Sequence, residues 1–268
     1  MDTKMPCAPP AWVFGAEAFE KSDNTVIRWL GIGAALINSR GTNILLDPML
    51  TEFNMPMLIE MPITPEQIPA FDGMLVTHVD RDHYSVPTCL ALKEKCPQYH
   101  STQYVAALMR GEGLNGIGHD IGDEFAIGSV KVKVTPADHC WQNEDPRYQG
   151  KRVYKPEEYC GFWMDTPDGT FWSPGDSKLL KEQLMMPEPD AIFFDFSDNE
   201  WHITLKGALK MAETYPNADL ILIHWGSVNR PDLSACNADP KELMKNVMHP
   251  QRVHLVAPGE PFILSKKK

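Results

Sequence analysis

Short runs of apolar residues recur along the whole chain and are separated by turns or by amphipathic stretches. Runs of this kind, rich in Val, Ile, Leu, Phe and Trp and bounded by Gly, Pro, Asn or Asp, are typical of buried strands. The pattern predicts strands at residues 25–30, 35–39, 42–47, 73–77, 130–136, 161–166, 169–173, 190–196, 219–225, 252–258 and 261–265.

Between these runs lie stretches with the periodicity and the end signals of helices. Ser85 is a good N-cap, and Pro87 fits the first turn of the helix that follows. The pattern predicts helices at residues 85–96, 101–113, 176–184, 203–215 and 239–248. Strands crowd the first half of the chain and then alternate with helices, which indicates an α/β fold of two packed sheets with helices outside. No internal repeat or linker divides the chain, so we expect a single domain spanning residues 1–268.

Composition and charge limit the kind of protein this is. The 268 residues are 43% hydrophobic, enough to fill a sizeable core. No apolar run reaches the about 18 residues of a membrane span, the start lacks a signal-peptide layout, and the six cysteines form no dense framework. We therefore expect a cytoplasmic protein with reduced thiols. A net charge of −11 opposes binding to nucleic acid, which leaves a small molecule as the expected partner.

Histidines and aspartates stand directly after four of the predicted strands. The motif HVDRDH, which supplies His78, Asp80, Asp82 and His83, follows residues 73–77. Three later apolar runs, VKVKVTP, GTFWS and DLILI, are followed by single candidates, namely His139, Asp176 and His224. Because strand ends meet at one rim of a sheet, these side chains are expected to converge, with residues 78, 80 and 82 on one side of an extended segment. Imidazoles and carboxylates are ligands for zinc, manganese and iron, and the set suffices for two ions.

Each of these signals also has a structural explanation. A single acidic and histidine-rich loop is often only a polar loop, a lone histidine after a strand is often a buried packing residue, and Gly-Asp-Ser is a common turn. The four signals together, in order and each at a strand end, favour a metal site.

The ordered motifs resemble those of the metallo-β-lactamase-fold hydrolases over about residues 25 to 265. The segments SPGDS, WHIT and ILIHWGS are similar to L-ascorbate-6-phosphate lactonase and N-acyl phosphatidylethanolamine phospholipase D. The resemblance implies a four-layer αββα sandwich of two mixed sheets flanked by helices. It also implies one metal held by His78, Asp80 and His139, a second held by Asp82, His83 and His224, a bridging Asp176, and Asp47 orienting the ligand loop.

Asp80 departs from the histidine that most hydrolases of this family carry at its position. An extra carboxylate favours manganese or iron over zinc and lowers the Lewis acidity of the site. A similar substitution occurs in flavodiiron proteins, so a di-iron redox module is one alternative and a metal-binding, non-catalytic protein is another. We expect no flavodoxin-like domain, and the sequence shows no flavin-phosphate loop, which favours the hydrolase.

The expected reaction is hydrolysis of a lactone, an ester or a phosphodiester by a hydroxide shared between two metal ions. Asp82 or Asp176 is a candidate to carry the proton to the leaving group, and His202 is a candidate hydrogen-bond donor to the substrate or merely a packing residue. The aperiodic loop 140–160 carries Arg147, Tyr148 and Arg152, which either bind an anionic group or belong to a solvated loop. Apolar loops make a homo-oligomer plausible.

Overall fold

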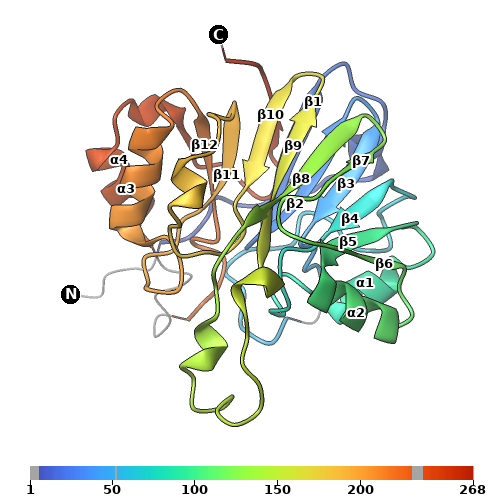
Figure 1. Cartoon of the computed structure of the whole chain (residues 1–268). Coiled ribbons are helices and arrows are strands. Elements are labelled where there is room, and N and C mark those ends of the chain that lie inside the picture. The colour runs from blue at the N-terminus through green and yellow to red at the C-terminus, as the bar shows by residue number, and fades with distance from the viewer. Residues whose placement is uncertain (1–5, 52, 231–237, 268) are drawn as a thin grey trace.

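Two seven-stranded sheets packed face to face form the centre of the molecule in the computed structural model, which describes residues 6–51, 53–230 and 238–267 (Figure 1). The first sheet has the order β14 (Pro261–Ile263), β1 (Thr25–Gly31), β2 (Ala34–Ser39), β3 (Thr42–Leu46), β4 (Gly73–Leu75), β5 (Tyr99–Thr102) and β6 (Gly116–His119). The second has the order β13 (Val253–His254), β12 (Asp219–Ile223), β11 (Ala191–Asp195), β10 (Gly169–Ser173), β9 (Cys160–Thr166), β8 (Val130–Pro136) and β7 (Glu124–Ile127). Both sheets mix parallel and antiparallel pairs.

Large apolar side chains from both sheets fill the space between them. Trp29 and Leu46 of the first sheet belong to the same buried cluster as Phe162, Trp172 and Phe193 of the second. The polar atoms of the tryptophans are satisfied, because Trp29 Nε1 donates to a backbone carbonyl at 2.8 Å and Trp172 Nε1 to a threonine hydroxyl at 3.2 Å. Burial of such residues contributes about 25 cal/mol per Å² of apolar surface and keeps the two sheets in a fixed relation.

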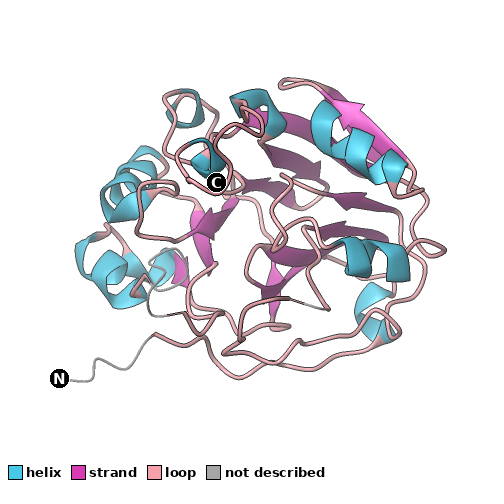
Figure 2. Ribbon diagram, turned by 90° about the horizontal axis from the view of Figure 1, so that it is seen from below, coloured by secondary structure: helices cyan, strands magenta, loops and turns pink. Residues whose placement is uncertain are grey.

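Helices cover the outer faces of both sheets (Figure 2). Helices α1 (Val86–Ala91) and α2 (Gln103–Gly111) lie beside β5 and β6, and α3 (Thr204–Thr214) and α4 (Pro240–Asn246) lie beside β11 and β12 (Figure 1). Ser85 caps α1 by accepting a hydrogen bond from Thr88 N at 3.3 Å, as its sequence position predicts. The layers are helix, sheet, sheet, helix, so the predicted α/β sandwich is confirmed. Within the described residues, no helix is long and apolar enough to cross a bilayer.

All eleven predicted strands are present, but three further strands were missed. These are β5, β6 and β7, which are only four residues long and are interrupted by polar residues or glycine. β5 lies between β4 and β6 in parallel pairing, so its burial comes from its neighbours rather than from an apolar pattern of its own.

The prediction of a helix at residues 176–184 was wrong. Only Glu182–Leu184 forms a single 3-10 turn, and the preceding residues run as an irregular loop. Its backbone is held by other contacts, because Lys178 N donates to Asp138 O at 2.9 Å and Leu180 N donates to Gln183 Oε1 at 3.1 Å. Tertiary hydrogen bonds therefore override a favourable helical pattern here.

Candidate metal centre

Side chains that follow the carboxyl ends of strands in both sheets come together at one rim of the sandwich. They form three groups in which the candidate ligand atoms lie within 4.8 Å of one another, and the third of these joins Asp195 and His202 to Asp176 and His224. The other two contain the predicted metal ligands. The first group is His78, Asp80 and His139, and the second is Asp82, His83, Asp176 and His224. The structure thus brings together all seven residues that the sequence pattern pointed to, while their division between two metal ions stays a prediction.

A tight turn divides the acidic and histidine-rich loop between the two groups. His83 N and Tyr84 N both donate to Asp80 O, at 2.9 and 2.7 Å. The sequence pattern predicted an extended segment up to residue 82. The turn shows that this prediction was wrong. The turn places His78 and Asp80 in the first group and carries the chain back so that Asp82 and His83 enter the second.

Asp176 lies between the two groups. Its Oδ2 is 3.0 Å from His83 Nε2, 3.1 Å from His224 Nε2 and 4.0 Å from His139 Nε2, and its side chain is only 3% exposed. Among the described residues, Asp176 Oδ1 and His78 Nε2 are buried without a hydrogen-bond partner. Buried polar atoms of this kind are costly unless something else satisfies them, and an imidazole nitrogen next to carboxylates suits divalent metal ions.

Asp47 holds the ligand loop from beneath. Its Oδ1 accepts a hydrogen bond from Thr77 N at 2.7 Å, and its Oδ2 accepts from Thr77 Oγ1 at 2.7 Å and from His83 Nδ1 at 2.8 Å. With Nδ1 of His83 donating to a carboxylate, Nε2 is the nitrogen that faces Asp176. A role for Asp47 in tuning metal binding stays a prediction.

The first group is oriented by residues that the sequence analysis missed. Asp80 accepts hydrogen bonds from Trp141 Nε1 at 2.7 Å and from Gln142 Nε2 at 2.6 Å. His139 Nδ1 donates to Trp201 O at 2.8 Å, which leaves its Nε2 3.6 Å from Asp80 Oδ2. The position of Trp141 and Gln142, two and three residues after His139, is the one signal that pointed to them.

The charges of the site are strongly coupled. Burial opposes ionisation of Asp80, but nearby His78, whose Nε2 lies 3.5 Å from Asp80 Oδ2, and the charge of His139 outweigh it and lower the pKa of Asp80 to about 2. Burial together with neighbouring His202 lowers the pKa of His139 to about 3. Burial also opposes protonation of His83, yet the carboxylates of Asp176 and Asp47 raise its pKa well above the usual value. Without a metal, a proton therefore occupies the second group.

His202 lies beside the centre and is held by Asp195, another residue that the sequence analysis missed. His202 Nδ1 donates to Asp195 Oδ2 at 2.7 Å, and Ser197 Oγ donates to Asp195 Oδ1 at 2.9 Å. The ring of His202 is centred 4.6 Å from that of His139 and 5.0 Å from that of His224. Asp195 ends β11 just as the other candidates follow strands, so the same search of strand ends would have found it.

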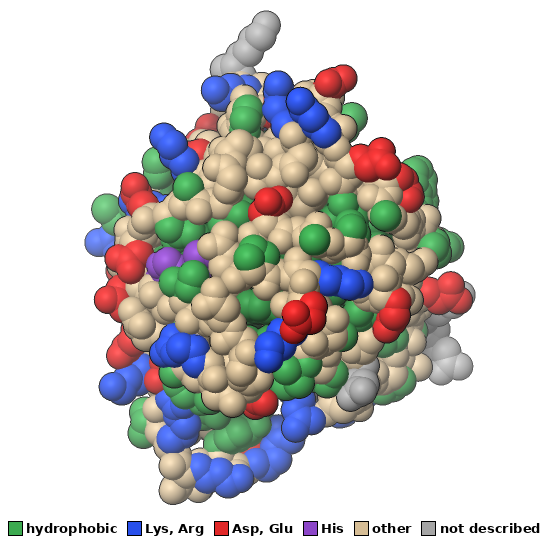
Figure 3. Space-filling model, turned by 90° about the vertical axis from the view of Figure 1, so that its right-hand side faces the viewer, with side chains coloured by type: hydrophobic (Ala, Val, Ile, Leu, Met, Phe, Trp, Pro, Cys, Tyr) green, Lys and Arg blue, Asp and Glu red, His purple; other side chains and the backbone are tan. Residues whose placement is uncertain are grey.

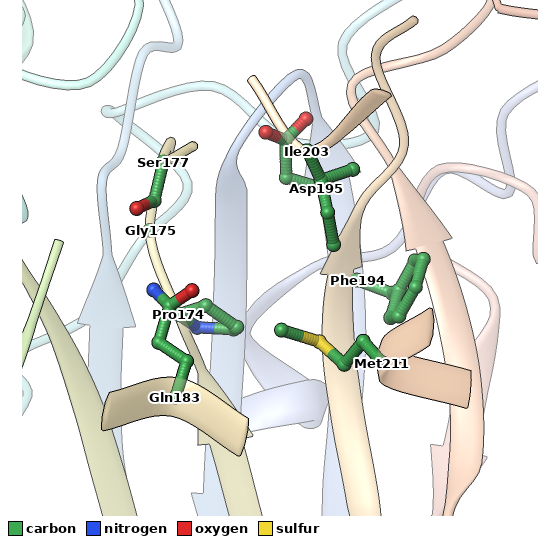
Figure 4. A pocket seen from close by; sticks show the side chains of 8 residues that line it. All are labelled: Pro174, Gly175, Ser177, Gln183, Phe194, Asp195, Ile203 and Met211. Atoms are coloured by element: carbon green, nitrogen blue, oxygen red, sulfur yellow. The ribbon is translucent and has the colours of Figure 1, made fainter. Parts of the chain in front are cut away.

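Figure 4 shows Asp195 near the end of its strand, with Ile203 next to it. These two residues and six others line a cavity of about 10 Å³. That volume holds no more than about one water molecule, so this cavity is not a substrate pocket.

The loop 140–160 projects from the body of the protein at the bottom of Figure 1, in yellow-green. Figure 3 shows several Lys and Arg side chains at this lower end. Arg147 pairs with Asp145 at 2.6 Å, and Arg152 pairs with Glu158 at 2.5 Å, while Tyr148 follows Arg147 directly along the loop. Both guanidinium groups thus have carboxylate partners inside the loop, and substrate binding by Arg147, Tyr148 and Arg152 stays a prediction.

Backbone strain is concentrated at the same rim. Asp47, His224 and Thr204, which is two residues after His202, have φ values of 44°, 73° and 60°. Left-handed φ values are unfavourable for residues other than glycine, above all for a β-branched threonine. Such strain persists only where the surrounding contacts enforce it, which is common at functional sites.

Residues 42–225, more than half of the chain, match the family model described as the beta-lactamase superfamily domain. The chain belongs to this family. A relative named a UPF0173 metal-dependent hydrolase, from Caldivirga maquilingensis, is 22% identical over 246 residues, which cover 90% of this chain and 99% of the relative.

Two solved structures share the fold of this family member. One is Igni18, described as a metallo hydrolase from the archaeon Ignicoccus hospitalis, with a TM-score of 0.71 and 17% identity over 91% of this chain and all of the other. The other is an isothiocyanate hydrolase from Delia radicum gut bacteria, with a TM-score of 0.71 and 18% identity over 90% of this chain and all of the other. The expected metallo-β-lactamase fold is confirmed, and the narrower resemblance to the lactonase and phospholipase branch stays a prediction.

Proposed function

We propose that this chain is a metal-dependent hydrolase that cleaves a lactone, an ester or a phosphodiester bond in a small anionic metabolite. The observation that carries the proposal is the pair of adjacent His and Asp groups with Asp176 between them. The names of relatives that cover nearly the whole chain, metal-dependent hydrolases, support the same reaction class.

The proposed cofactors are two divalent ions of zinc, manganese or iron. When bound, such ions lower the pKa of a water molecule and polarise a carbonyl or phosphoryl group. The first group would hold one ion and the second group the other, with Asp176 contacting both. Asp80 makes the first group harder than a histidine would, which favours manganese or iron there.

The protein's own side chains would handle the proton of the reaction. Asp82 is 21% exposed and Asp176 only 3%, so Asp82 is the better placed of the two to pass a proton between the site and a leaving group. His202 uses Nδ1 to donate to Asp195, which leaves Nε2 as the ring nitrogen for the substrate. In the neutral ring Nε2 would accept a hydrogen bond from a substrate hydroxyl or water, and it would donate to a substrate oxygen, the predicted role, in the imidazolium form.

A panel of aryl esters, lactones and bis(4-nitrophenyl) phosphate tests the proposal on metal-loaded protein. We expect hydrolysis of at least one class, loss of that activity on chelation, and recovery when manganese, zinc or iron is returned. Hydrolysis that persists in chelator, or its absence from the whole panel with both metal groups filled, would contradict it.

The carboxylate of Asp80, at a position where most hydrolases of the family have histidine, is also compatible with a di-iron redox module or a metal-binding protein without catalytic activity. The variant Asp80→His separates them from the hydrolase. A gain of zinc-dependent hydrolysis fits a hydrolase with an altered metal preference, whereas oxygen consumption by the iron-loaded wild type without hydrolysis fits the redox alternative. Metal binding with neither activity fits a non-catalytic protein.

A further inference from the structure

An open cleft of about 330 Å³ lies next to the metal centre, between the loop after β10 and the start of α3. Its walls include three lysines, Lys178, Lys206 and Lys210, one carboxylate, Glu200, and His202. This cleft is more than ten times larger than the cavity of about 10 Å³ behind Asp195. It is large enough to hold a small metabolite.

The cleft is positive in a protein whose net charge is −11. Lys210 forms an ion pair at 3.0 Å with Glu213, which does not line the cleft. Within the described part of the chain, neither Lys178 nor Lys206 forms an ion pair, and Lys178 Nζ lies 3.9 Å from the ring centre of Trp201. Two ammonium groups are therefore left without a carboxylate partner at the cleft, which favours an anionic ligand.

The backbone at the start of α3 is not the source of this preference. Leu205 N donates to Asp198 Oδ1 at 2.8 Å, and Gly207 N donates to Thr204 Oγ1 at 3.1 Å. Because these N–H groups already have partners, charge attraction to the lysines is what distinguishes the cleft from an ordinary helix start.

His202 connects the cleft to the metal centre. It lines the cleft, is only 4% exposed, and its ring packs against the rings of His139 and His224. A molecule that places an anionic group near Lys178 and Lys206 can therefore place its neighbouring atoms beside His202, whose ring contacts two of the proposed metal ligands.

We infer that Lys178 and Lys206 bind a carboxylate or phosphate group of the substrate in this cleft. The inference rests on the proposed hydrolase function and adds the residues that select an anionic substrate. It differs from the predicted role of Arg147 and Arg152, whose charges are paired within their own loop.

Two ester probes with the same leaving group test the inference on metal-loaded protein. One is neutral 4-nitrophenyl acetate, and the other is the anionic mono-4-nitrophenyl ester of succinic acid. In the double variant Lys178→Gln/Lys206→Gln we expect KM for the anionic ester to rise about tenfold or more, the effect of one lost charge-assisted contact. KM for the neutral ester should stay within about twofold.

A double variant on α4, Lys241→Gln/Lys245→Gln, is the matched control, because it removes the same charge from exposed positions that do not line the cleft. It should leave both KM values unchanged. An equal KM for the anionic ester in the cleft variant and the wild type would overturn the inference and leave the hydrolase proposal intact. The inference would also be overturned if KM for the anionic ester rose in the loop variant Arg147→Glu/Arg152→Glu but not in the cleft variant.

Calorimetric titration with inorganic phosphate and with succinate provides a readout that does not depend on turnover. We expect the cleft variant to lose at least tenfold in affinity for one of the two anions, which also tells phosphate from carboxylate preference. If this loss is seen while no ester, lactone or phosphodiester is hydrolysed, the cleft is an anion site and the hydrolase proposal fails. If neither anion distinguishes the variant from the wild type, the inference fails.

Discussion

Asp47→Asn tests whether the buried carboxylate beneath the ligand loop controls metal binding. The substitution preserves the shape of the side chain, and asparagine tolerates the left-handed φ of 44° at this position. Asp47 accepts three hydrogen bonds and donates none. An amide has only one acceptor oxygen, so its NH₂ group must face a donor in either orientation.

Either orientation of the amide breaks one hydrogen bond that holds the ligand loop. If the amide oxygen accepts from His83 Nδ1, the NH₂ group faces Thr77 N–H. If it is turned the other way, the NH₂ group faces Nδ1, and His83 has to move its proton to Nε2, the nitrogen proposed to bind metal. One lost charge-assisted hydrogen bond is worth about 1.5–3 kcal/mol, which corresponds to roughly 10- to 100-fold in metal affinity.

The assay is competition with a chromophoric chelator, with Asp72→Asn as the matched control. Asp72 Oδ2 also accepts a backbone hydrogen bond, from Asn43 N at 2.7 Å, but lies away from the ligand loop. We expect Asp47→Asn to weaken metal binding and Asp72→Asn to leave it unchanged. Wild-type metal affinity in Asp47→Asn would refute the reasoning.

Three further predictions follow from packing and protonation. A Cβ at Gly33 would lie 2.5 Å from His83 Cε1, so Gly33→Ala should lower metal affinity at least tenfold in the same chelator assay, whereas Gly111→Ala, with open space around it, should not. Because nearby carboxylates raise the pKa of His83, metal binding should release a proton and should tighten with rising pH. Calorimetry in buffers of different ionisation enthalpy measures the number of protons released. Metal binding without proton release would contradict this prediction. Burial, with a contribution from His119, lowers the pKa of His100 to about 4. Below about pH 6.5 the unfolded state therefore binds more protons than the folded state. The free energy of unfolding, measured in urea, should fall by roughly 1–2 kcal/mol from pH 7 to 5. The variant His100→Phe should show less of this loss, and an unchanged pH dependence would exclude His100 as its cause.

The apolar pattern was enough to find the strands that build the core, because each of them is buried through its own side chains. β5 escaped because its polar residues are buried by the strands on either side, whereas β6 and β7 are four residues long, only partly buried and without an apolar run of their own. Residues 176–184 have a helical pattern but form a loop tied to Asp138. Long-range hydrogen bonds of this kind are invisible in a single sequence.

The candidate ligands were predictable because each follows a strand and strand ends converge. The partners that orient them were harder to find. Gln142 orients Asp80, and the backbone carbonyl of Trp201 orients His139, through one hydrogen bond each. Each of these hydrogen bonds joins two residues that are far apart in the chain. The lysines of the cleft belong to a loop and to a helix start that only the fold brings together.

Metal content per chain, measured by inductively coupled plasma mass spectrometry for the wild type and for Asp176→Ala, tests the central claim most directly. Because Asp176 lies between both groups, we predict about two divalent ions in the wild type and a loss of at least one in the variant, with Lys245→Gln unchanged. A wild type that retains no metal after incubation with manganese, zinc and iron, or an Asp176→Ala variant that keeps both ions, would contradict the account.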